Sequence, residues 1–285
     1  MLVATQLRGR QLVGLPYSDY CKCLCGSQEE ICDVVDVVQR SAAALKVSYW
    51  EVRDYVTGTP GKAVDAGYVH VLQLTGDPDH ASRRFRKTRI RDPLNKARTL
   101  GRVTVERSTD AAAMNTYYGL HLKTRKRLGA ISQSRAYFHH LHDRMVSRGD
   151  GLVVLAFDGR KAIAGAVVLF GKGTAVLRHS ASLECSWKLY PNHLVIWECI
   201  RAACERDKQR FDFGRTGAQN VGLAAFKRGW GTDAMPLTYT RGGSLGKFRE
   251  RAIVGLRTTL RHTLPRVPDR VAAGVGRMLY ASLGV

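Results

Sequence analysis

The stretch that most constrains the fold is residues 210–232, where a short apolar strand meets a glycine-broken polar loop and then a helix. Phe211-Asp212-Phe213 alternates as a strand does, with two aromatic side chains on one face and a carboxylate on the other. The loop carries Arg215 and Asn220, and apolar residues at helical spacing follow as far as Lys227. Such a connection gathers free backbone N–H groups and a guanidinium, which together favour an anionic ligand. The alternative is an ordinary strand-to-helix connection whose basic side chains are solvated.

The charge of the chain is strongly positive and uneven. The net charge is +21, and residues 81–150 alone carry 17 basic and 5 acidic side chains. This excess indicates a polyanionic partner, which could be nucleic acid, an acidic membrane surface or a phosphorylated substrate. The densest part, residues 83–98, holds eight basic residues that could face phosphates, and we expect Pro93 to interrupt a simple helix there. The alternative is a solvated, partly helical connector.

The C-terminal residues 241–285 form a second basic segment. Arginines are interleaved with apolar residues in an amphipathic pattern that Pro265 and Pro268 break. Such a segment could lie on an anionic membrane near a lipid-linked acceptor. The alternative is a tail packed on the domain with its arginines in solvent.

The remaining composition is that of a globular protein. No apolar run is long enough to span a membrane, and the first residues lack the apolar run of a signal peptide, so we expect a cytoplasmic protein, with the inner face of the membrane left open. The seven cysteines are odd in number, which argues against a disulfide framework, and their spacing lacks the paired CxxC motifs of structural zinc sites. We therefore predict no metal.

Residues 103–240 predict the element order β-α-α-β-β-β-α-β-α-β, which is the order of the GNAT N-acyltransferase fold. In that fold two neighbouring strands part and the acyl thioester lies between them. Here the parting strands would be Ala175–Ser182 and Arg210–Phe213. The helix that starts at Pro191 would direct its N-terminus at the phosphates of the donor.

Several motifs carry a closer resemblance, over about residues 12–240. They are Leu15-Pro16-Tyr17-Ser18-Asp19-Tyr20, Tyr118 to Arg125, Tyr190-Pro191-Asn192-His193-Leu194, Phe211 to Thr216, and Phe226-Lys227-Arg228-Gly229-Trp230-Gly231 followed by Pro236 to Tyr239. With these motifs the chain resembles the FemAB-like branch of the GNAT superfamily, which includes peptidoglycan-bridge aminoacyltransferases and acyltransferases of exopolysaccharide loci.

The resemblance implies an α+β fold of tandem GNAT-like units, with mixed sheets flanked by helices and an incomplete first unit. The expected domains are a partial N-terminal unit with the basic connector at residues 1–102, an acyltransferase domain at 103–240 and a basic helical tail at 241–285. It also implies transfer of an acyl or aminoacyl group to an amine of a cell-envelope or exopolysaccharide precursor. The donor would be acyl-CoA or aminoacyl-tRNA, with no tightly bound cofactor. The usual GNAT phosphate loop is absent, so the choice of donor stays open, as does a contact with tRNA or with an anionic membrane.

Amide formation needs a neutral amine, stabilisation of the oxyanion and a route for one proton. By resemblance, Lys227 is the candidate cation near the developing charge, and its alternative role is a surface pair with Asp233. Asp212 and Asp19 are the candidate bases, with structural carboxylate and turn former as the alternatives. No cysteine has a base nearby in sequence, so we expect no covalent intermediate.

Four further residues are candidates for binding the donor: Arg215, Asn192, Arg178 and Asn220. Arg215 could clamp a phosphate or carboxylate with two hydrogen bonds, or simply pair with Asp212. Asn192 could bind the donor at the start of a helix, or cap that helix. His179 and the other histidines are more typical of core or surface positions than of catalysis. The competing hypothesis for the whole chain is a non-catalytic basic module that binds nucleic acid or an anionic membrane.

Overall fold

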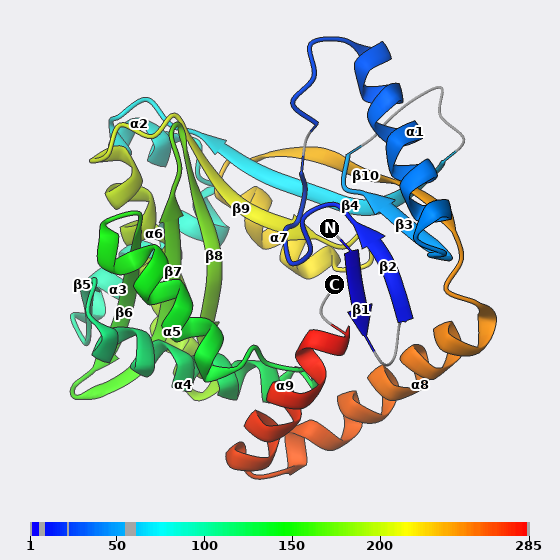
Figure 1. Ribbon diagram of the computed structural model, residues 1–285. Helices are drawn as coiled ribbons and strands as arrows, with labels where there is room; N and C mark the ends of the chain where they lie inside the picture. The colour runs from blue at the N-terminus through cyan, green and yellow to red at the C-terminus, as the bar shows by residue number, and fades with distance from the viewer. Residues whose placement is uncertain (1, 6–8, 22, 55–60, 284–285) are drawn as a thin grey trace.

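A single mixed sheet of ten strands runs through the computed structural model, which describes residues 2–5, 9–21, 23–54 and 61–283 (Figure 1). The strand order is β1-β2-β3-β10-β4-β9-β8-β7-β6-β5. The strands are β1 (Leu2–Thr5), β2 (Gly9–Val13), β3 (Tyr49–Val52), β4 (Lys62–Gln73), β5 (Val103–Ser108), β6 (Gly151–Asp158), β7 (Lys161–Phe170), β8 (Thr174–Ser182), β9 (Arg210–Thr216) and β10 (Asp233–Gly243).

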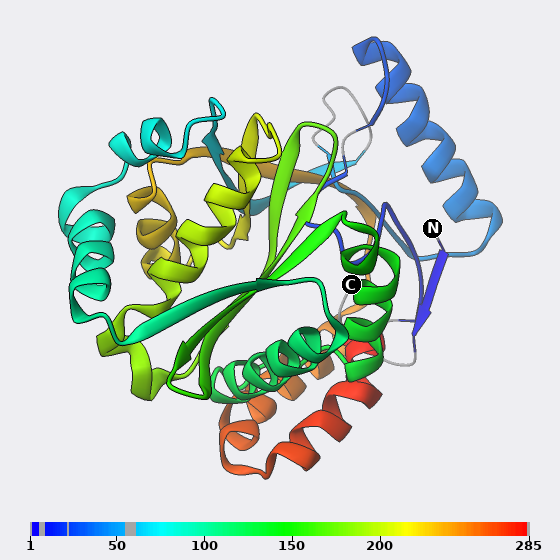
Figure 2. The same ribbon diagram turned by 90° about the vertical axis from the view of Figure 1, so that its left-hand side faces the viewer.

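Helices cover both faces of the β5–β9 part of the sheet (Figure 2). The α-helices are α1 (Gln28–Ala44), α2 (Pro78–Arg83), α3 (Asp92–Leu100), α4 (Ala111–Arg127), α5 (Arg135–Arg144), α6 (Pro191–Cys204), α7 (Val221–Gly229), α8 (Lys247–Thr263) and α9 (Asp269–Leu283). Short helices of other types are η1 (Lys87–Arg91), η2 (Val146–Arg148), η3 (Glu184–Leu189) and η4 (Leu264–Arg266). The α+β class predicted from the sequence is confirmed.

Alternation along β6 shows how the two layers are held. Leu152 and Val154 pack with α3 and α6 on one face, whereas Val153 and Leu155 pack with α4 and α5 on the other. Because both faces of the strand are covered, β6 reads as a continuous apolar run rather than as apolar residues alternating with polar ones.

The basic connector is helical but not in the way that the sequence predicts. A π-helical turn, η1, is followed directly by α3, and Pro93 lies in the first turn of α3 instead of interrupting a helix. The first turn tolerates proline because its backbone N–H groups have no helical partner. Phe85, Ile90 and Leu94 anchor this segment in the core beneath α6, and the eight basic side chains between residues 83 and 98 are exposed.

The C-terminal helices form a layer of their own. Ile253, Leu260 and Leu264 of the α8–η4 segment pack with Leu122 of α4 and Ala272 of α9. Helix α8 starts near the end of β10 and reaches the C-terminal end of α4, so it connects the two halves of the molecule (Figure 1). This arrangement gives a second wall to the space in front of β8 and β9.

Candidate active site

Strands β8 and β9 part, as the resemblance predicts. They pair in parallel at three positions, Thr174 with Arg210, Ala175 with Phe211, and Val176 with Asp212. Beyond Val176, β8 continues to Ser182 on its β7 side and β9 continues to Thr216 on its β4 side, with no further pairing between them. The facing backbone edges of the two strands are therefore open.

Each strand carries a bulge where it leaves the other. In β8, Val168 lies opposite Leu177 and Val167 opposite His179, so Arg178 is an extra residue. In β9, the register shift against β4 leaves two residues, Phe213 and Gly214, opposite one. A bulge bends its strand and redirects side chains, and two of them at the same level explain why the strands diverge.

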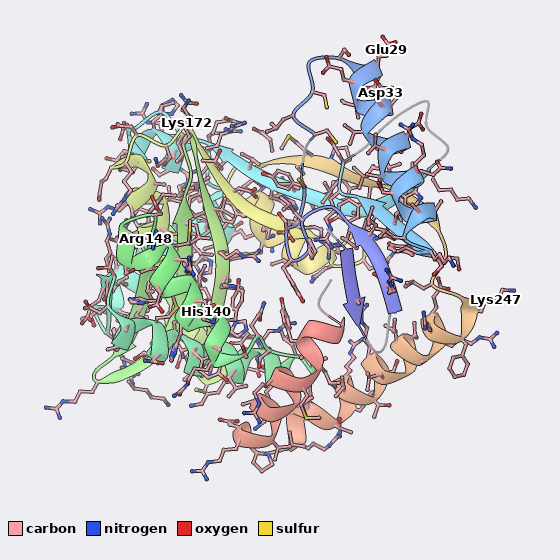
Figure 3. All side chains as sticks on the ribbon, viewed as in Figure 1. Glu29, Asp33, His140, Arg148, Lys172 and Lys247 are labelled. Atoms are coloured by element: carbon pink, nitrogen blue, oxygen red, sulfur yellow. The ribbon has the colours of Figure 1, made fainter. Side chains whose placement is uncertain are left out.

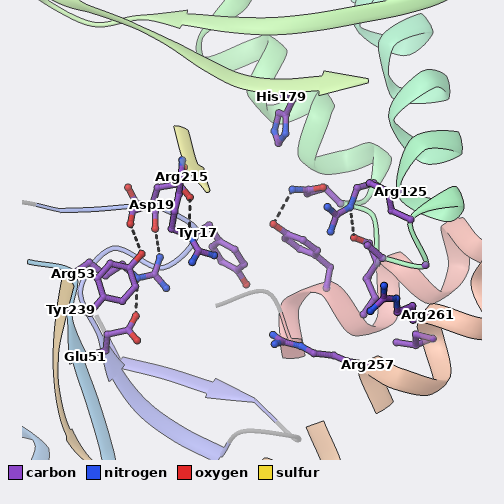
Figure 4. Close-up of a pocket in the computed structure, with 18 of the residues that line it drawn as sticks. Tyr17, Asp19, Glu51, Arg53, Arg125, His179, Arg215, Tyr239, Arg257 and Arg261 are labelled. Atoms are coloured by element: carbon purple, nitrogen blue, oxygen red, sulfur yellow. Dashed lines mark hydrogen bonds and ion pairs between the residues drawn. The ribbon is translucent and has the colours of Figure 1, made fainter. Parts of the chain in front are cut away.

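A cavity of about 970 Å³ lies in front of the parted strands (Figure 4). Its walls come from the Tyr17–Asp19 loop, β3, β8, β9, β10, the Arg125–Gln133 segment at the end of α4, and helices α8 and α9. Because the β8 bulge adds one residue, the consecutive side chains of Arg178 and His179 both line this space. The volume is in the range of small-molecule sites.

The cavity is strongly basic. Its lining includes seven arginines and three acidic residues, which are Arg53, Arg125, Arg178, Arg215, Arg241, Arg257, Arg261, Asp19, Glu51 and Glu250. Buried Glu51 accepts hydrogen bonds from Arg53 Nε at 2.9 Å and Arg241 Nε at 2.7 Å. These guanidiniums, with Tyr49, lower the pKa of Glu51 although burial alone would raise it. Glu51 therefore neutralises only part of the positive lining.

Helix α8 contributes two arginines that have no ion pair or hydrogen bond from their side chains to the described part of the chain. Arg257 and Arg261 are four residues apart, so they lie on one helix face, and both line the cavity (Figure 4). Arg178 differs, because it donates to Tyr17 O at 2.7 Å. The guanidinium groups of the α8 pair are thus free of hydrogen bonds to the described residues, unlike that of Arg178.

Asp19 and Arg215 come together on the cavity wall, as predicted for site residues. The Asp19 carboxylate accepts from Arg215 N at 3.2 Å and lies 4.0 Å from Arg215 Nε, while Arg215 Nη1 donates to Ala66 O at 3.0 Å. Tyr239 donates to Asp19 O and ties the loop to β10. Arg178 also lines the cavity, so the fold assembles three of the seven sequence candidates there.

Asp212 and Lys227 lie behind this wall and hold the β9 bulge. Asp212 is 2% exposed, and it accepts from Gly214 N at 2.7 Å and from Tyr20 Oη at 2.9 Å. Burial raises the pKa of Asp212, and burial together with Asp212 raises the pKa of Tyr20 to about 12. Lys227 Nζ donates to Gly214 O at 2.8 Å and to Arg215 O at 3.1 Å. Burial lowers the pKa of Lys227 to about 8.

Asn192 and Asn220 are not among the residues that line the cavity. Asn192 Nδ2 donates to Ser182 Oγ at 2.9 Å, which ties the start of α6 to the end of β8. Asn220 is the N-cap of α7, and its side chain accepts from Leu223 N at 3.2 Å. In this structure Asn192 connects two elements and Asn220 caps its own helix.

Sequence reasoning missed several cavity residues for identifiable reasons. Glu51, Arg53 and Tyr239 meet only because β3 and β10, nearly 200 residues apart, are neighbours in the sheet. His179 enters the cavity because of the β8 bulge, and the residue types in this strand do not predict a bulge. The α8 arginines carried a signal in their spacing, but their target depends on where the helix docks.

Two negative findings apply to the residues that the structure describes. No group of three or more His, Cys, Asp or Glu side chains is placed to hold a metal ion. Among these residues there is also no helix with the length and apolarity needed to cross a membrane.

Comparisons with known proteins agree with this geometry. The sequence profile of the acetyltransferase (GNAT) domain matches residues 81–228, just over half of the chain. The structure of FemX has a TM-score of 0.61 at 16% identity, covering 87% of this chain and 83% of FemX. The C-terminal domain of a putative lysylphosphatidylglycerol synthetase from Agrobacterium fabrum has a TM-score of 0.55 at 11% identity, covering 82% and 79%. L-PGS from Bacillus licheniformis has a TM-score of 0.51 at 11% identity, covering 85% of this chain and 81% of L-PGS.

No curated protein matches. The chain therefore belongs to the acetyltransferase (GNAT) domain family, and its fold is that of the FemAB-like branch.

Proposed function

We propose that the protein is an N-acyltransferase that moves an acyl or aminoacyl group from acyl-CoA or aminoacyl-tRNA to an amine of a cell-envelope or exopolysaccharide precursor. The observation that carries this proposal is the parting of β8 and β9 at the edge of a large basic cavity. The open β8 edge beyond Val176 offers backbone N–H and C=O groups to an extended donor arm, which would bring the acyl carbonyl to the cavity.

The basic connector supports a donor that carries phosphates. It lies next to the helices on the other side of the gap, because Arg86 N donates to Gly229 O at 2.8 Å and His193 Nε2 lies 3.2 Å from Arg89 O. Its exposed cations are thus beside the start of α6 and the end of α7. Both CoA and tRNA carry phosphates, so this surface is consistent with either donor.

The cavity supports an anionic acceptor. Arg257 and Arg261 of α8 face it without a counter-ion among the described residues, and guanidinium groups bind phosphate and carboxylate well. The similarity in fold to a putative lysylphosphatidylglycerol synthetase, whose name joins an aminoacyl group to an anionic lipid, supports the same class of acceptor.

In this proposal five of the seven predicted residues have a defined task. Asp19 and Arg215 contact the reacting groups at the cavity wall. Lys227 and Asp212 hold the β9 bulge at the carbonyl-binding end of the gap, through their hydrogen bonds to the backbone of Gly214 and Arg215. Arg178 orients the acceptor beside them.

The decisive experiment is a donor and acceptor screen with purified protein. Thiol release is measured with acetyl- and longer acyl-CoA, and deacylation is measured with charged tRNA, each with amino-sugar and peptide amines. We expect acceptor-dependent turnover with one donor class and a loss of at least tenfold in Arg215→Gln. Lys172→Gln, at the exposed β7–β8 turn (Figure 3), is the matched control and should keep wild-type turnover. The absence of turnover with every donor would contradict the proposal.

A second arm tests the class of acceptor. The double variant Arg257→Gln, Arg261→Gln should raise the KM for phosphorylated acceptors by about tenfold or more, because each charge-assisted bond contributes about 1.5–3 kcal/mol. Arg251→Gln, on the exposed face of the same helix and not among the residues lining the cavity, is the control. An unchanged KM in the double variant would show that the acceptor does not use these arginines.

A further inference from the structure

We infer that His179 is the residue that transfers the proton in this reaction, accepting it from the attacking amine and returning it to the leaving group. The inference rests on the proposed function and adds a catalytic residue to it. Its basis is the position of the ring in the cavity, the way neighbouring side chains fix its orientation, and the engagement of both carboxylate oxygens of Asp212 by other groups.

His179 lies where the reacting groups would meet. It is three residues beyond Val176, the last residue of β8 that pairs with β9. The bulge at Arg178 directs it into the cavity, and its ring points into the open space between Arg215 on one side and Arg125 on the other (Figure 4). A donor arm that follows the open edge of β8 would therefore reach this ring.

Aromatic neighbours fix the plane of the ring. Tyr137 packs edge-on against it, with centroids 5.6 Å apart and an interplanar angle of 86°, and His121 does so at 5.5 Å and 72°. The ring centroid of Phe138 lies 5.2 Å from that of His179. Tyr137 Oη is 3.1 Å from His179 Nε2. The tautomer in which Nε2–H donates to Tyr137 leaves a lone pair on Nδ1, which has no hydrogen bond to the described residues.

The surroundings keep the imidazole neutral, as a proton acceptor must be. The groups that face it are Tyr137 from α5, His121 and Arg125 from α4, and Arg178 from β8 itself. Burial is the main cause of the lowered pKa of His179, and the nearby cations act in the same direction. Asp212 cannot take this role from its place behind the wall, because both of its oxygens are occupied by Gly214 and Tyr20.

The step balances without any further reactant. The neutral amine attacks the carbonyl carbon, the C–N bond forms, and the nitrogen becomes an acidic ammonium. Nδ1 of His179 accepts one N–H proton from it. The C–S bond of a thioester or the C–O bond of an aminoacyl ester then breaks, and the imidazolium returns the proton to the departing sulfur or oxygen, leaving an amide and a thiol or hydroxyl.

The test compares three variants with wild type on the donor and acceptor that the screen identifies. His179→Ala should lower kcat by 10²–10⁴-fold with a KM change below about threefold. Added imidazole should restore at least a tenth of wild-type kcat, because the cavity is open to small molecules. Tyr137→Phe should lower kcat by about fivefold through loss of the bond that sets the tautomer. His140→Ala, an exposed histidine on the same helix as Tyr137, is the control and should keep wild-type kcat (Figure 3).

Each outcome decides the matter. A His179→Ala variant with kcat within threefold of wild type overturns the inference while the transferase proposal stands. A folded variant whose lost kcat imidazole does not restore overturns it too, because the ring would then act only through packing. No wild-type turnover with any donor removes the inference together with the proposed function.

Discussion

Replacing Lys227 by methionine is the perturbation that most directly tests how the β9 bulge is held. Lys227 is 6% exposed, and its ammonium lies on the carbonyls of Gly214 and Arg215. Methionine keeps a similar unbranched stem but removes both hydrogen bonds and the charge. The energetic result depends on pH, because burial of the ammonium and its hydrogen bonds act in opposite directions.

The magnitude follows from the pKa. The pKa of Lys227 is about 8 in the fold, against an ordinary value of 10.5. The folded state therefore loses this proton at a lower pH than the unfolded state does, and the free energy of unfolding rises as the pH increases from about 8 to about 10.5. Between pH 7 and pH 9.5 the wild-type protein should gain about 2 kcal/mol from this group. Lys227→Met has no such gain.

At pH 7 the effects of the substitution nearly offset one another. Loss of two charge-assisted hydrogen bonds lowers the free energy of unfolding by about 3–6 kcal/mol, and removal of the buried charge raises it by about 3 kcal/mol. We expect the variant to be less stable by up to about 3 kcal/mol at pH 7, and by about 2 kcal/mol more than that at pH 9.5.

Urea denaturation of both proteins at the two pH values measures this. In the difference in the free energy of unfolding between the two proteins, the contributions of all other titrating groups cancel, provided that both proteins unfold in one transition. Lys172→Met, at an exposed turn, should show a difference from wild type that does not depend on pH. If the wild-type advantage over Lys227→Met stays constant or shrinks as the pH rises, the buried-ammonium argument is refuted.

Two further substitutions test the walls of the cavity. Glu51→Gln should lower the free energy of unfolding by about 3 kcal/mol at pH 7, because it leaves Arg53 and Arg241 without their counter-ion. The fold lowers the pKa of Glu51 from 4.5, so the carboxylate stabilises the protein fully above pH 4.5, and this stabilisation is lost as the pH falls through the pKa of the folded state. Urea titrations should therefore show a smaller difference in the free energy of unfolding between Glu51→Gln and wild type at pH 3.5 than at pH 7. Gly214→Ala should lower the free energy of unfolding by about 1–2 kcal/mol, because φ is +72° at this position, and should also lower turnover by moving Arg215. Thermal unfolding and the transfer assay measure the two effects, and unchanged values in both would show that the bulge adapts to a side chain.

Much of the fold could be predicted from the sequence because its signals are local. Serine is a residue type typical of N-caps, and Ser27 caps α1, with its side chain accepting from Glu30 N. The element order predicted for residues 103–240 contains three consecutive strands, and β6, β7 and β8 form them as antiparallel neighbours. These elements are specified by periodicity and capping within about fifteen residues, which a single sequence contains.

The candidate site was predictable only where it depends on one continuous segment. The motif from Phe211 to Lys227 indicated a strand, a polar loop and a helix, and the element order of the GNAT fold predicted that this strand parts from Ala175–Ser182, as it does. It did not show that Asp212 and Lys227 would lie behind the wall while Arg215 lines it. Side chains alternate along a strand, but the bulge at Gly214 changes the alternation, and a bulge depends on the register against β4.

The walls of the cavity divide by their origin in the chain, and this division bears on specificity. Arg178 and Arg215 lie within residues 81–228, the part that matches the acetyltransferase domain profile. Glu51, Arg257 and Tyr280 come from outside it. The gap that would hold the donor is thus built by the matched part alone, whereas the surface opposite it is built by flanking segments that meet only in the folded protein. Because a donor and an acceptor must approach the same carbonyl from different sides, we expect substitutions in α8 and α9 to change the KM for the acceptor and to leave the KM for the donor unaltered. Equal effects on both values in the Arg257→Gln, Arg261→Gln variant would show instead that one wall serves both substrates.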